Sequence, residues 1–437
     1  MPEIQIRHAT VVTMNPDRTV IPDGTVHVTD GTIDCVATSE NAPAPGPDCT
    51  VLLLPDHVLI PGVINAHTHL PMSLFRGLAD DLPLREWLED HIFPAEASFI
   101  DTETIPPAVQ LSVAEMLLSG TTCCADGYFL EEHVLRAASS AGFRGVFAHG
   151  VIDFRAPGIP DPARKLDVVR EYLEHQDESA LQTRAVFAHS PYTCSADTLK
   201  AAKQLASAFG RRFFIHAAET AWEREQILSE HGLSPVAYLD SLGILDPETV
   251  LVHAVHVDEP DCDRIAGRGA SVVVNTESNM KLASGVAPIP GFLDRGIPVA
   301  LGTDSAASNN DLDMLSEMGS TAKLQKVVRQ DPSAVPAEQV MRMATIGGAT
   351  ALGMDHLIGS IEPGKRADLT ALKIDGPHAT PLYDVISHLV YSAKSADVDT
   401  VIVDGHIRVR DRELVDLDLP SVRRQVRRIA ERIRIAG

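Results

Sequence analysis

The segment PGVINAHTHL, residues 61–70, places His67 and His69 one residue apart at the end of a short apolar run. In an extended strand, side chains at positions i and i+2 point to the same side, so both imidazoles can face one point, as two metal ligands do. Taken alone, the pair is more simply two polar residues of a loop. A metal site therefore requires further ligand-type residues at the ends of neighbouring elements.

The middle of the chain predicts strands that end together. Apolar segments that end in polar or small residues alternate there with stretches of helical periodicity, such as 201–210 and 223–232. This alternation predicts an α/β fold, a (β/α)8 TIM-like barrel. A doubly wound sheet is the rival, but no glycine-rich dinucleotide turn follows any of these strands. The eight candidate strands are residues 57–67, 120–127, 144–150, 183–190, 211–219, 249–256, 270–275 and 297–305.

Both ends of the chain read differently from the middle. Residues 1–57 and 366–437 contain short segments rich in Val, Ile and Thr, and the dipeptide Asp404-Gly405 predicts a hairpin turn. We expect them to pair into a small β-sandwich built from both ends, with the barrel at 58–365. The last residues predict a terminal helix docked on the body, with one apolar face made of Val422, Val426, Ile429 and Ile433.

Composition excludes several classes of function. The chain has 37 Lys and Arg against 60 Asp and Glu, a formal net charge of −23, which repels a phosphate backbone and argues against nucleic-acid binding. No secretory signal and no apolar run of about 18 residues is visible. The six cysteines show no CxxC pair and are expected to be reduced thiols. We expect a cytoplasmic protein that neither spans nor binds a membrane.

Ligand-type residues gather at the predicted strand ends. Catalytic groups of a (β/α)8 barrel sit at the carboxyl ends of its strands. The first strand ends in His67 and His69, the fifth in His216, the sixth in His253 and the eighth in Asp304. Imidazole and carboxylate suit zinc, and also iron or manganese, better than calcium or magnesium. Four strand ends converging on one rim predict a divalent metal site.

Glu219 follows His216 by three residues. A carboxylate beside a metal, just past a strand end, is well placed to shuttle protons. The alternative is an ordinary helix N-terminal glutamate, a position where this residue is common. Its neighbours favour the catalytic role.

These motifs resemble the amidohydrolase superfamily, and within it the methylthioadenosine/S-adenosylhomocysteine deaminases. The resemblance covers essentially the whole chain, and the histidine and aspartate positions are its most specific part. It implies one divalent metal, most often zinc, and hydrolytic deamination of an adenosine-type nucleoside to the inosine analogue and ammonia. The segments that carry it are residues 61–96, 216–219, 253–256, 275–285 and 301–314.

The resemblance also implies roles for single residues. Glu219 would relay protons to the purine ring, His253, rather than His256, would assist the attacking water, and Asp304 would accept a proton. Glu96 would hold the ribose hydroxyls, His189 would contact the substrate, and Trp87 would cap the base or its thioether tail unless it only anchors a helix. The fourth strand ends in His189 and not in a lysine that bridges two metals. The metal ligands would be His67, His69, His216 and Asp304.

Three positions depart from the family pattern. His149 stands where relatives commonly carry an arginine that pairs with a substrate carboxylate, and histidine is a weaker, pH-dependent substitute. Arg155 or Arg164 could compensate. Ser305 and Thr276 replace a common glycine and proline. The departures make S-adenosylhomocysteine a less secure substrate than methylthioadenosine, adenosine or 5′-deoxyadenosine.

Two other functions stay open at this point. Guanine or 8-oxoguanine deaminases and triazine chlorohydrolases share these ligands, although Glu96 favours a nucleoside over a bare base. A non-catalytic binding protein on the same scaffold should have lost ligands, and none is missing here. The expected partner is a small nucleoside, and association into homo-oligomers is left open.

Overall fold

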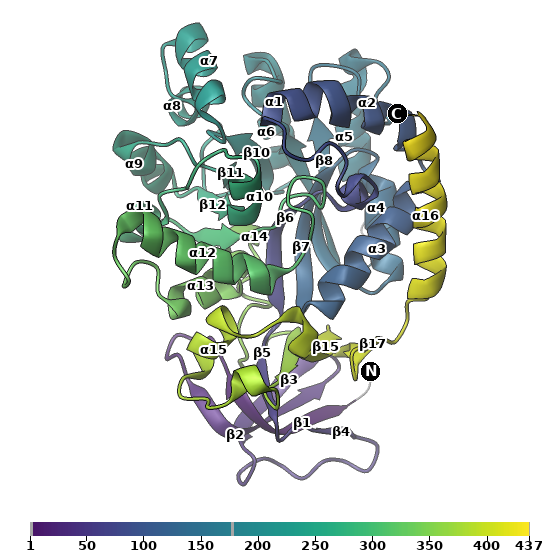
Figure 1. The fold of residues 1–437 in the computed structure, drawn as a ribbon, viewed down its shortest axis with the longest axis vertical. Helices are drawn as coiled ribbons and strands as arrows, with labels where there is room; N and C mark the ends of the chain where they lie inside the picture. Colours follow the sequence, from purple (N-terminus) through teal and green to yellow (C-terminus); the bar gives the residue numbers. More distant parts are fainter. Residues whose placement is uncertain (1–2, 176–178, 437) are drawn as a thin grey trace.

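A computed structural model describes residues 3–175 and 179–436 of the chain. It contains an eight-stranded parallel sheet surrounded by helices and, next to it, a second, mixed sheet. Figure 1 shows the two parts stacked along the long axis, with the mixed sheet at the bottom. The α/β fold with a barrel and a second sheet built from both chain ends is therefore confirmed.

The eight parallel strands follow one another in chain order around the barrel. The backbone N–H of Asp304, just after the last strand, donates to the carbonyl of His67 at 3.0 Å and so connects the last strand to the first. Carboxyl ends of all these strands therefore lie at one rim. The strands are β6 (Val63–Thr68), β7 (Thr121–Tyr128), β8 (Arg144–Val151), β9 (Gln182–Ala188), β10 (Phe213–Ala217), β11 (Thr249–His253), β12 (Ser271–Val274) and β13 (Val299–Leu301).

The prediction of one strand over residues 57–67 was wrong. The segment forms two strands of different sheets, β5 (His57–Pro61) and β6, which meet at Gly62. A Cβ atom on Gly62 would lie only 2.0 Å from Oγ1 of Thr122, so the chain needs a glycine where it passes from one sheet to the other. The proposed division of the chain at residues 57 and 365 stays a prediction.

The second sheet joins the two ends of the chain. Its hydrogen-bonded path runs β17-β16-β15-β14-β5-β1-β2-β3, with β4 also pairing β1. The predicted hairpin is present between β15 and β16, where Asp404 and Gly405 both have positive φ, as a type I′ turn requires. The strands are β1 (Ile4–Val12), β2 (Val20–Thr29), β3 (Thr32–Thr38), β4 (Thr50–Leu53), β14 (Leu369–Lys373), β15 (Val398–Val403), β16 (His406–Arg410) and β17 (Glu413–Leu414).

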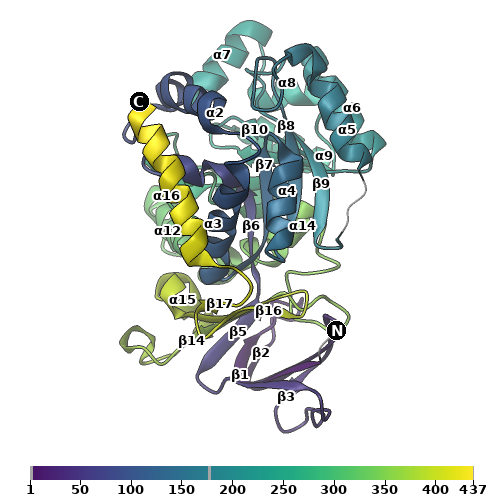
Figure 2. The ribbon, with the colours of Figure 1, turned by 90° about the vertical axis from the view of Figure 1, so that its right-hand side faces the viewer.

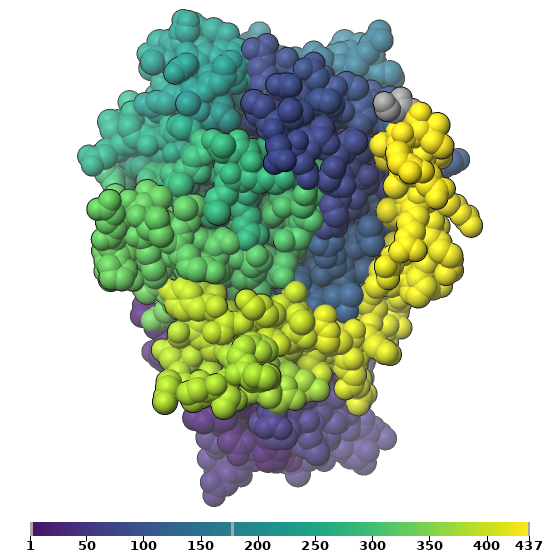
Figure 3. Space-filling view, viewed as in Figure 1, coloured from purple at the N-terminus to yellow at the C-terminus, as the bar shows by residue number. Residues whose placement is uncertain are grey.

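Helices cover the barrel, and the last one, α16 (Leu419–Ala436), runs along its outside beside α3 (Figures 1 to 3). The side chains of Val422, Ile429 and Ile433, on the face of α16 that the periodicity predicted to be apolar, are buried. In the described ranges, no helix has the length and apolar character needed to cross a membrane. The other helices are α1 (Leu84–Glu86), α2 (Phe93–Phe99), α3 (Ile105–Leu118), α4 (Glu131–Ser140), α5 (Lys165–Glu174), α6 (Ala196–Ala208), α7 (Ala221–His231), α8 (Pro235–Ser241), α9 (Glu259–Arg268), α10 (Thr276–Lys281), α11 (Ile289–Asp294), α12 (Met314–Arg329), α13 (Ala337–Met343), α14 (Ile346–Leu352) and α15 (Val385–Tyr391).

A buried ion pair fastens the barrel to the second sheet. Nε and Nη2 of Arg144, on barrel strand β8, donate to both carboxylate oxygens of Asp368 at 2.6 and 3.0 Å. Nη2 also donates to Asp404 at 2.8 Å. Because a buried charge without its partner is costly, this bidentate pair fixes how the strands of the barrel sit on the sheet.

The long connection between β6 and α3 lies over the rim of the barrel. After the 3-10 helix at Leu70–Phe75 it forms α1, a π-helical turn at Trp87–Ile92 and then α2. We call residues 70–99 the β6–α3 segment. Isolated π-helical turns occur frequently at functional sites, and this segment supplies much of the wall of the cavity described next.

Candidate active site

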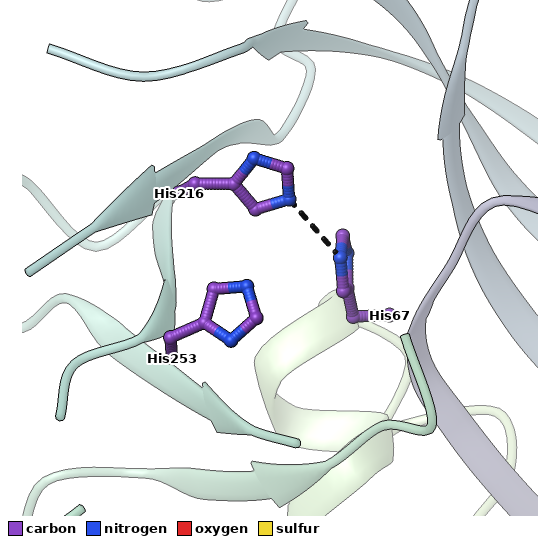
Figure 4. Close-up of side chains that lie close together, drawn as sticks. All are labelled: His67, His216 and His253. Carbon is purple, nitrogen blue, oxygen red and sulfur yellow. Dashed lines mark hydrogen bonds between the residues drawn. The ribbon is translucent and has the colours of Figure 1, made fainter. Parts of the chain in front are cut away.

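Five ligand-type side chains from four barrel strands converge at the rim. Figure 4 shows three of them, His67 from β6, His216 from β10 and His253 from β11, with their rings pointing toward one another. Asp304 follows β13, and His69 follows β6. The sequence placed all five at strand ends, and the structure brings them together.

The separations of the ligand atoms match those of a metal-binding cluster. Nε2 of His216 lies 3.3 Å from Nε2 of His67. Oδ1 of Asp304 lies 3.5 Å from Nε2 of His67 and 3.4 Å from Nε2 of His69. His67, His69 and Asp304 form one group of possible ligands, and His67, His216 and His253 form a second, with ligand atoms within 4.8 Å of one another in each group. Imidazole nitrogens and a carboxylate oxygen are donors that zinc prefers, so these five side chains form a cluster suited to a divalent metal.

The protonation states of the cluster also suit a metal. Burial, with the neighbouring charge of His67, lowers the pKa of His69 to about 4, and burial likewise lowers the pKa of His216. Both imidazoles are thus neutral near pH 7, which is the form that binds metals. Burial opposes ionisation of Asp304, but the hydrogen bond and charge of His67 hold the pKa of Asp304 well below its usual range.

The backbone is bent sharply at the ends of these strands. His253 and Asp304 have φ values of 76° and 61°, in the left-handed region that residues other than glycine rarely adopt. Such conformations cluster at functional sites, where the surrounding structure must hold them. At Gly302 a Cβ would lie 2.7 Å from the backbone nitrogen of His67, so the last strand approaches the first closely enough to bring Asp304 to the histidines.

Hydrogen bonds from behind aim the ligand atoms at the centre. Nδ1 of His69 donates to the carbonyl of Gly127 at 2.5 Å, which leaves Nε2 with its lone pair free. Oδ2 of Asp304 accepts from the hydroxyls of Ser278 at 2.7 Å and Ser308 at 2.9 Å, so that Oδ1 faces the histidines. Sequence reasoning missed both serines, although they lie in motifs that it had singled out.

His253 is held differently from the other three histidines. The side-chain amides of Asn275 and Asn279 donate to its Nδ1 at 3.2 and 3.0 Å. This arrangement puts the proton on Nε2, which lies 3.7 Å from Oε2 of Glu219. His253 is therefore built to donate a proton or a hydrogen bond into the cavity. His256 faces away, and its Nε2 donates to the carbonyl of Ser284 at 2.6 Å, in agreement with the preference for His253.

Glu219 is a buried acid, and the backbone around it is fixed by a second acid, Glu223. Burial, with the charges of Asp304 and Glu223, raises the pKa of Glu219 well above its ordinary value. Glu223, in the first turn of α7, accepts from the backbone N–H groups of Ala218 and Glu219 at 2.7 and 2.8 Å. Glu223 thus fixes the turn that aims Glu219. Its position four residues after Glu219 was the available sequence signal.

A cavity opens from the metal cluster, and the predicted contacts Trp87, Glu96 and His189 lie on its wall. Tyr128, at the end of β7, donates its hydroxyl to Oε1 of Glu96 at 2.5 Å. Burial raises the pKa of Glu96 to about 7 against the opposing effect of this bond. Tyr128 is a further residue that sequence reasoning missed, since its partner Glu96 lies 32 positions away in the chain.

His149 does not reach this cavity. Its ring lies against Tyr172 of α5, with 5.4 Å between ring centroids, and its Nδ1 donates to the carbonyl of Gly150 at 3.0 Å. Burial lowers the pKa of His149 to about 4, so the ring is neutral. Arg164 is exposed and paired with Glu171 at 3.1 Å. The geometry therefore gives no support to His149 as a contact for a substrate carboxylate.

The two other departures from the family pattern are placed as follows. Ser305 lies on the cavity wall and donates its hydroxyl to Ser308 at 3.1 Å. Thr276 is buried behind the site, where its backbone N–H donates to Glu317 and its hydroxyl lies 2.7 Å from that of Thr321. Only Ser305 therefore faces the space that a substrate would fill.

The fold and this site define a class of protein: the chain belongs to the amidohydrolase family, whose model matches residues 58–408. It is 44% identical, over 97% of both chains, to a 5-methylthioadenosine/S-adenosylhomocysteine deaminase of Syntrophobacter fumaroxidans. A 5′-deoxyadenosine deaminase of Methanothermobacter thermautotrophicus is 46% identical over 88% of this chain and 89% of its own. The crystal structure of a Xanthomonas campestris adenosine deaminase with bound zinc is 36% identical, covers 99% of both chains and superimposes with a TM-score of 0.96.

Proposed function

We propose that this chain is a zinc-dependent deaminase that converts adenosine-type nucleosides to their inosine analogues and ammonia. One observation carries the proposal: Glu219, a buried acid, stands next to a cluster of metal-binding groups in a cavity that also contains Glu96. Adenine deamination needs a proton donor at the ring nitrogen beside an activated water, and this pairing supplies both. The names of the relatives support the same substrate class.

The metal would be held by His67, His69, His216 and Asp304, and when bound it would lower the pKa of a water molecule toward neutrality. Glu219, protonated because of its raised pKa, donates a proton to the ring nitrogen next to the amine-bearing carbon. Asp304, ionised, takes the proton that the attacking water loses and passes it to the departing amine. Two carboxyl groups with opposite protonation states thus divide the acid and base roles.

Two remaining polar groups complete the reaction. The Nε2 proton of His253 stabilises the oxygen that adds to the ring, because two amides hold the opposite ring nitrogen. After the C–O bond has formed, the C–N bond breaks and ammonia leaves, and the hydroxyl proton of the adduct returns to Glu219, which gives the keto product and restores the acid. Glu96 accepts hydrogen bonds from the ribose hydroxyls, which favours a nucleoside over a free base or a triazine. His189 and Trp87 bound the space around the base.

The proposal is tested by ammonia release and loss of adenine absorbance from the zinc-loaded protein. The substrates are adenosine, 5′-methylthioadenosine and 5′-deoxyadenosine, with guanine and a chlorotriazine as the competing classes. We expect turnover of the adenosine compounds and none of the other two. Turnover of guanine or the triazine without any turnover of the nucleosides would exclude the proposal.

We expect Tyr128→Phe to raise KM for nucleosides about tenfold and to change kcat little, since Glu96 loses the bond that orients it and keeps it ionised. The pKa of Glu96 should rise further, so the KM defect should grow as pH falls. A 2′,3′-dideoxynucleoside, which lacks the hydroxyls, should show no such defect. Tyr172→Phe is the matched control, because that buried hydroxyl donates to the carbonyl of Phe147, which does not line the cavity. An equal KM change for both substrates would contradict the role.

We further propose that the protein acts in the cytoplasm and that residues 58–365 form its catalytic unit. The named site residues all fall within that range, which supports the division. A nucleoside is the proposed small-molecule partner, and the net charge of −23 disfavours nucleic acid. Sedimentation at several concentrations would establish whether the chain associates with itself.

A further inference from the structure

A second cavity lies directly outside the first. It has a volume of about 850 Å³, and five residues line both cavities: Leu84, Leu88, Phe93, Tyr192 and Leu282. The volume is within the range of pockets that hold small organic molecules. A nucleoside bound at the metal cluster would therefore direct any substituent that points outward into this space, which we call the outer cavity.

Aromatic rings line a continuous path from the catalytic rim to the outer cavity. Phe93 and Tyr192 lie 6.0 and 6.2 Å from the ring of His189 in the inner cavity. Phe93 continues to Phe154 at 5.4 Å, and Tyr192 to Trp222 at 5.2 Å, all edge to face. Aromatic edges and faces favour apolar groups, and thioether sulfur in particular.

The charged groups of the outer cavity already have partners. Nε of Arg85 donates to Glu89 at 2.9 Å, and its guanidinium lies over Trp222, 5.1 Å from the ring centroid. The contact bridges the β6–α3 segment and α7, whose dark-blue and teal surfaces meet at the top of Figure 3. Among the described residues that line the two cavities, Arg85 is the one Lys or Arg side chain.

The wall of the inner cavity offers no basic side chain to a substrate carboxylate. Its acidic lining residues are Glu96, Glu219 and Asp304, and among the described residues on its wall there is no Lys or Arg. A substrate carboxylate that entered would lose its water without gaining a Lys or Arg partner. Burying a charge without a partner costs far more than burying a methyl group gains.

We propose that the outer cavity is the subsite for the 5′ substituent and that it selects an uncharged, apolar group, such as a short thioether, over a zwitterionic amino-acid tail. The inference rests on the proposed deaminase function and deepens it. It assigns specificity to Phe93, Phe154, Tyr192 and Trp222, which line the cavity, and to the pairing of Arg85 with Glu89 on its wall.

The first test compares kcat/KM of the zinc-loaded enzyme for 5′-methylthioadenosine and S-adenosylhomocysteine. We expect the thioether nucleoside to be preferred by about 50-fold or more, because the homocysteine charges stay unpaired. Values within about threefold of each other would overturn the inference while leaving the deaminase function intact. Turnover of no adenosine compound at all would instead overturn the proposed function, and the inference with it.

Single substitutions distinguish the contribution of the aromatic side chains to substrate preference from that of the Arg85–Glu89 pair. Trp222→Ala should lower the ratio of kcat/KM for methylthioadenosine to that for adenosine about fivefold, as buried contact with the methylthio group is lost. Leu228→Ala, an exposed position on the same helix outside the cavity, should leave the ratio unchanged. Arg85→Ala should not reduce activity on S-adenosylhomocysteine relative to methylthioadenosine. A selective loss on S-adenosylhomocysteine would show that Arg85 releases Glu89 to bind a carboxylate, and would overturn the inference.

Discussion

Glu219→Gln should lower kcat about 1000-fold and leave bound zinc at one per chain, because a positioned acid contributes roughly that much to proton transfer. Glutamine keeps the size of the side chain and cannot donate the carboxyl proton. The wild-type rate should also fall as pH rises through the raised pKa of Glu219, since the acid form is the active one. The variant should lose that alkaline limb of its kcat profile.

Zinc analysis and a control substitution distinguish loss of the proton donor from loss of the metal or of the fold. Glu230→Gln alters an exposed glutamate on the same stretch of chain and should leave kcat unchanged. Zinc retained at one per chain in Glu219→Gln would exclude loss of the metal as the cause. A variant that kept more than about a tenth of wild-type kcat would contradict the role of Glu219 as the proton donor, since general acids contribute at least about 100-fold.

The residues of the metal cluster were predictable because each can be assigned from its position within its own strand. His67 lies in β6 and His69 directly follows its last residue, and the two-residue period of a strand predicts that both side chains face one side. The alternation of strands and helices places the strand ends at one rim. His216 and Asp304 were assigned because each lies at or just after the carboxyl end of its predicted strand. No long-range contact had to be guessed, so these positions could be assigned without a structure.

For His149, the sequence reasoning did not consider which face of its strand the side chain occupies. Val146 and Ala148 of β8 pack in the interior of the barrel, whereas Phe147 packs with Tyr172 on the side of the helices. His149 is two residues after Phe147 and therefore points to the same face of β8, toward Tyr172 and away from the barrel interior. The alternation within the strand therefore predicted its position, but the family comparison had drawn attention to residue type alone.

Other features depend on contacts that no local pattern contains. Tyr128 meets Glu96 because the β6–α3 segment folds back over the rim, and the two residues are 32 positions apart. The break at Gly62 follows from the side chain of Thr122, on a different strand. Such pairings are decided by packing between distant segments, and the sequence predicts the elements but not their contacts.

His216→Ala should abolish zinc binding and lower kcat by a factor of about 10000 or more, since the metal supplies the activated water. The substitution removes one of four donors and leaves Nε2 of His67 without its neighbour at 3.3 Å. His356→Ala, an exposed histidine outside the cavity, is the matched control and should keep both zinc and activity. Zinc content by elemental analysis and kcat are measured on the same samples.

Chelation tests the same cluster without altering a residue. Removal of zinc from the wild-type protein should abolish activity and lower its melting temperature, because ligands that favour only the folded state stabilise it. Zinc, and to a lesser degree iron(II) or manganese, should restore turnover, whereas magnesium should not, since three imidazoles suit the softer cations. Restoration by magnesium, or His216→Ala that still binds one zinc with wild-type kcat, would mean that these histidines are not the ligands. The catalytic centre would then have to lie elsewhere on the rim.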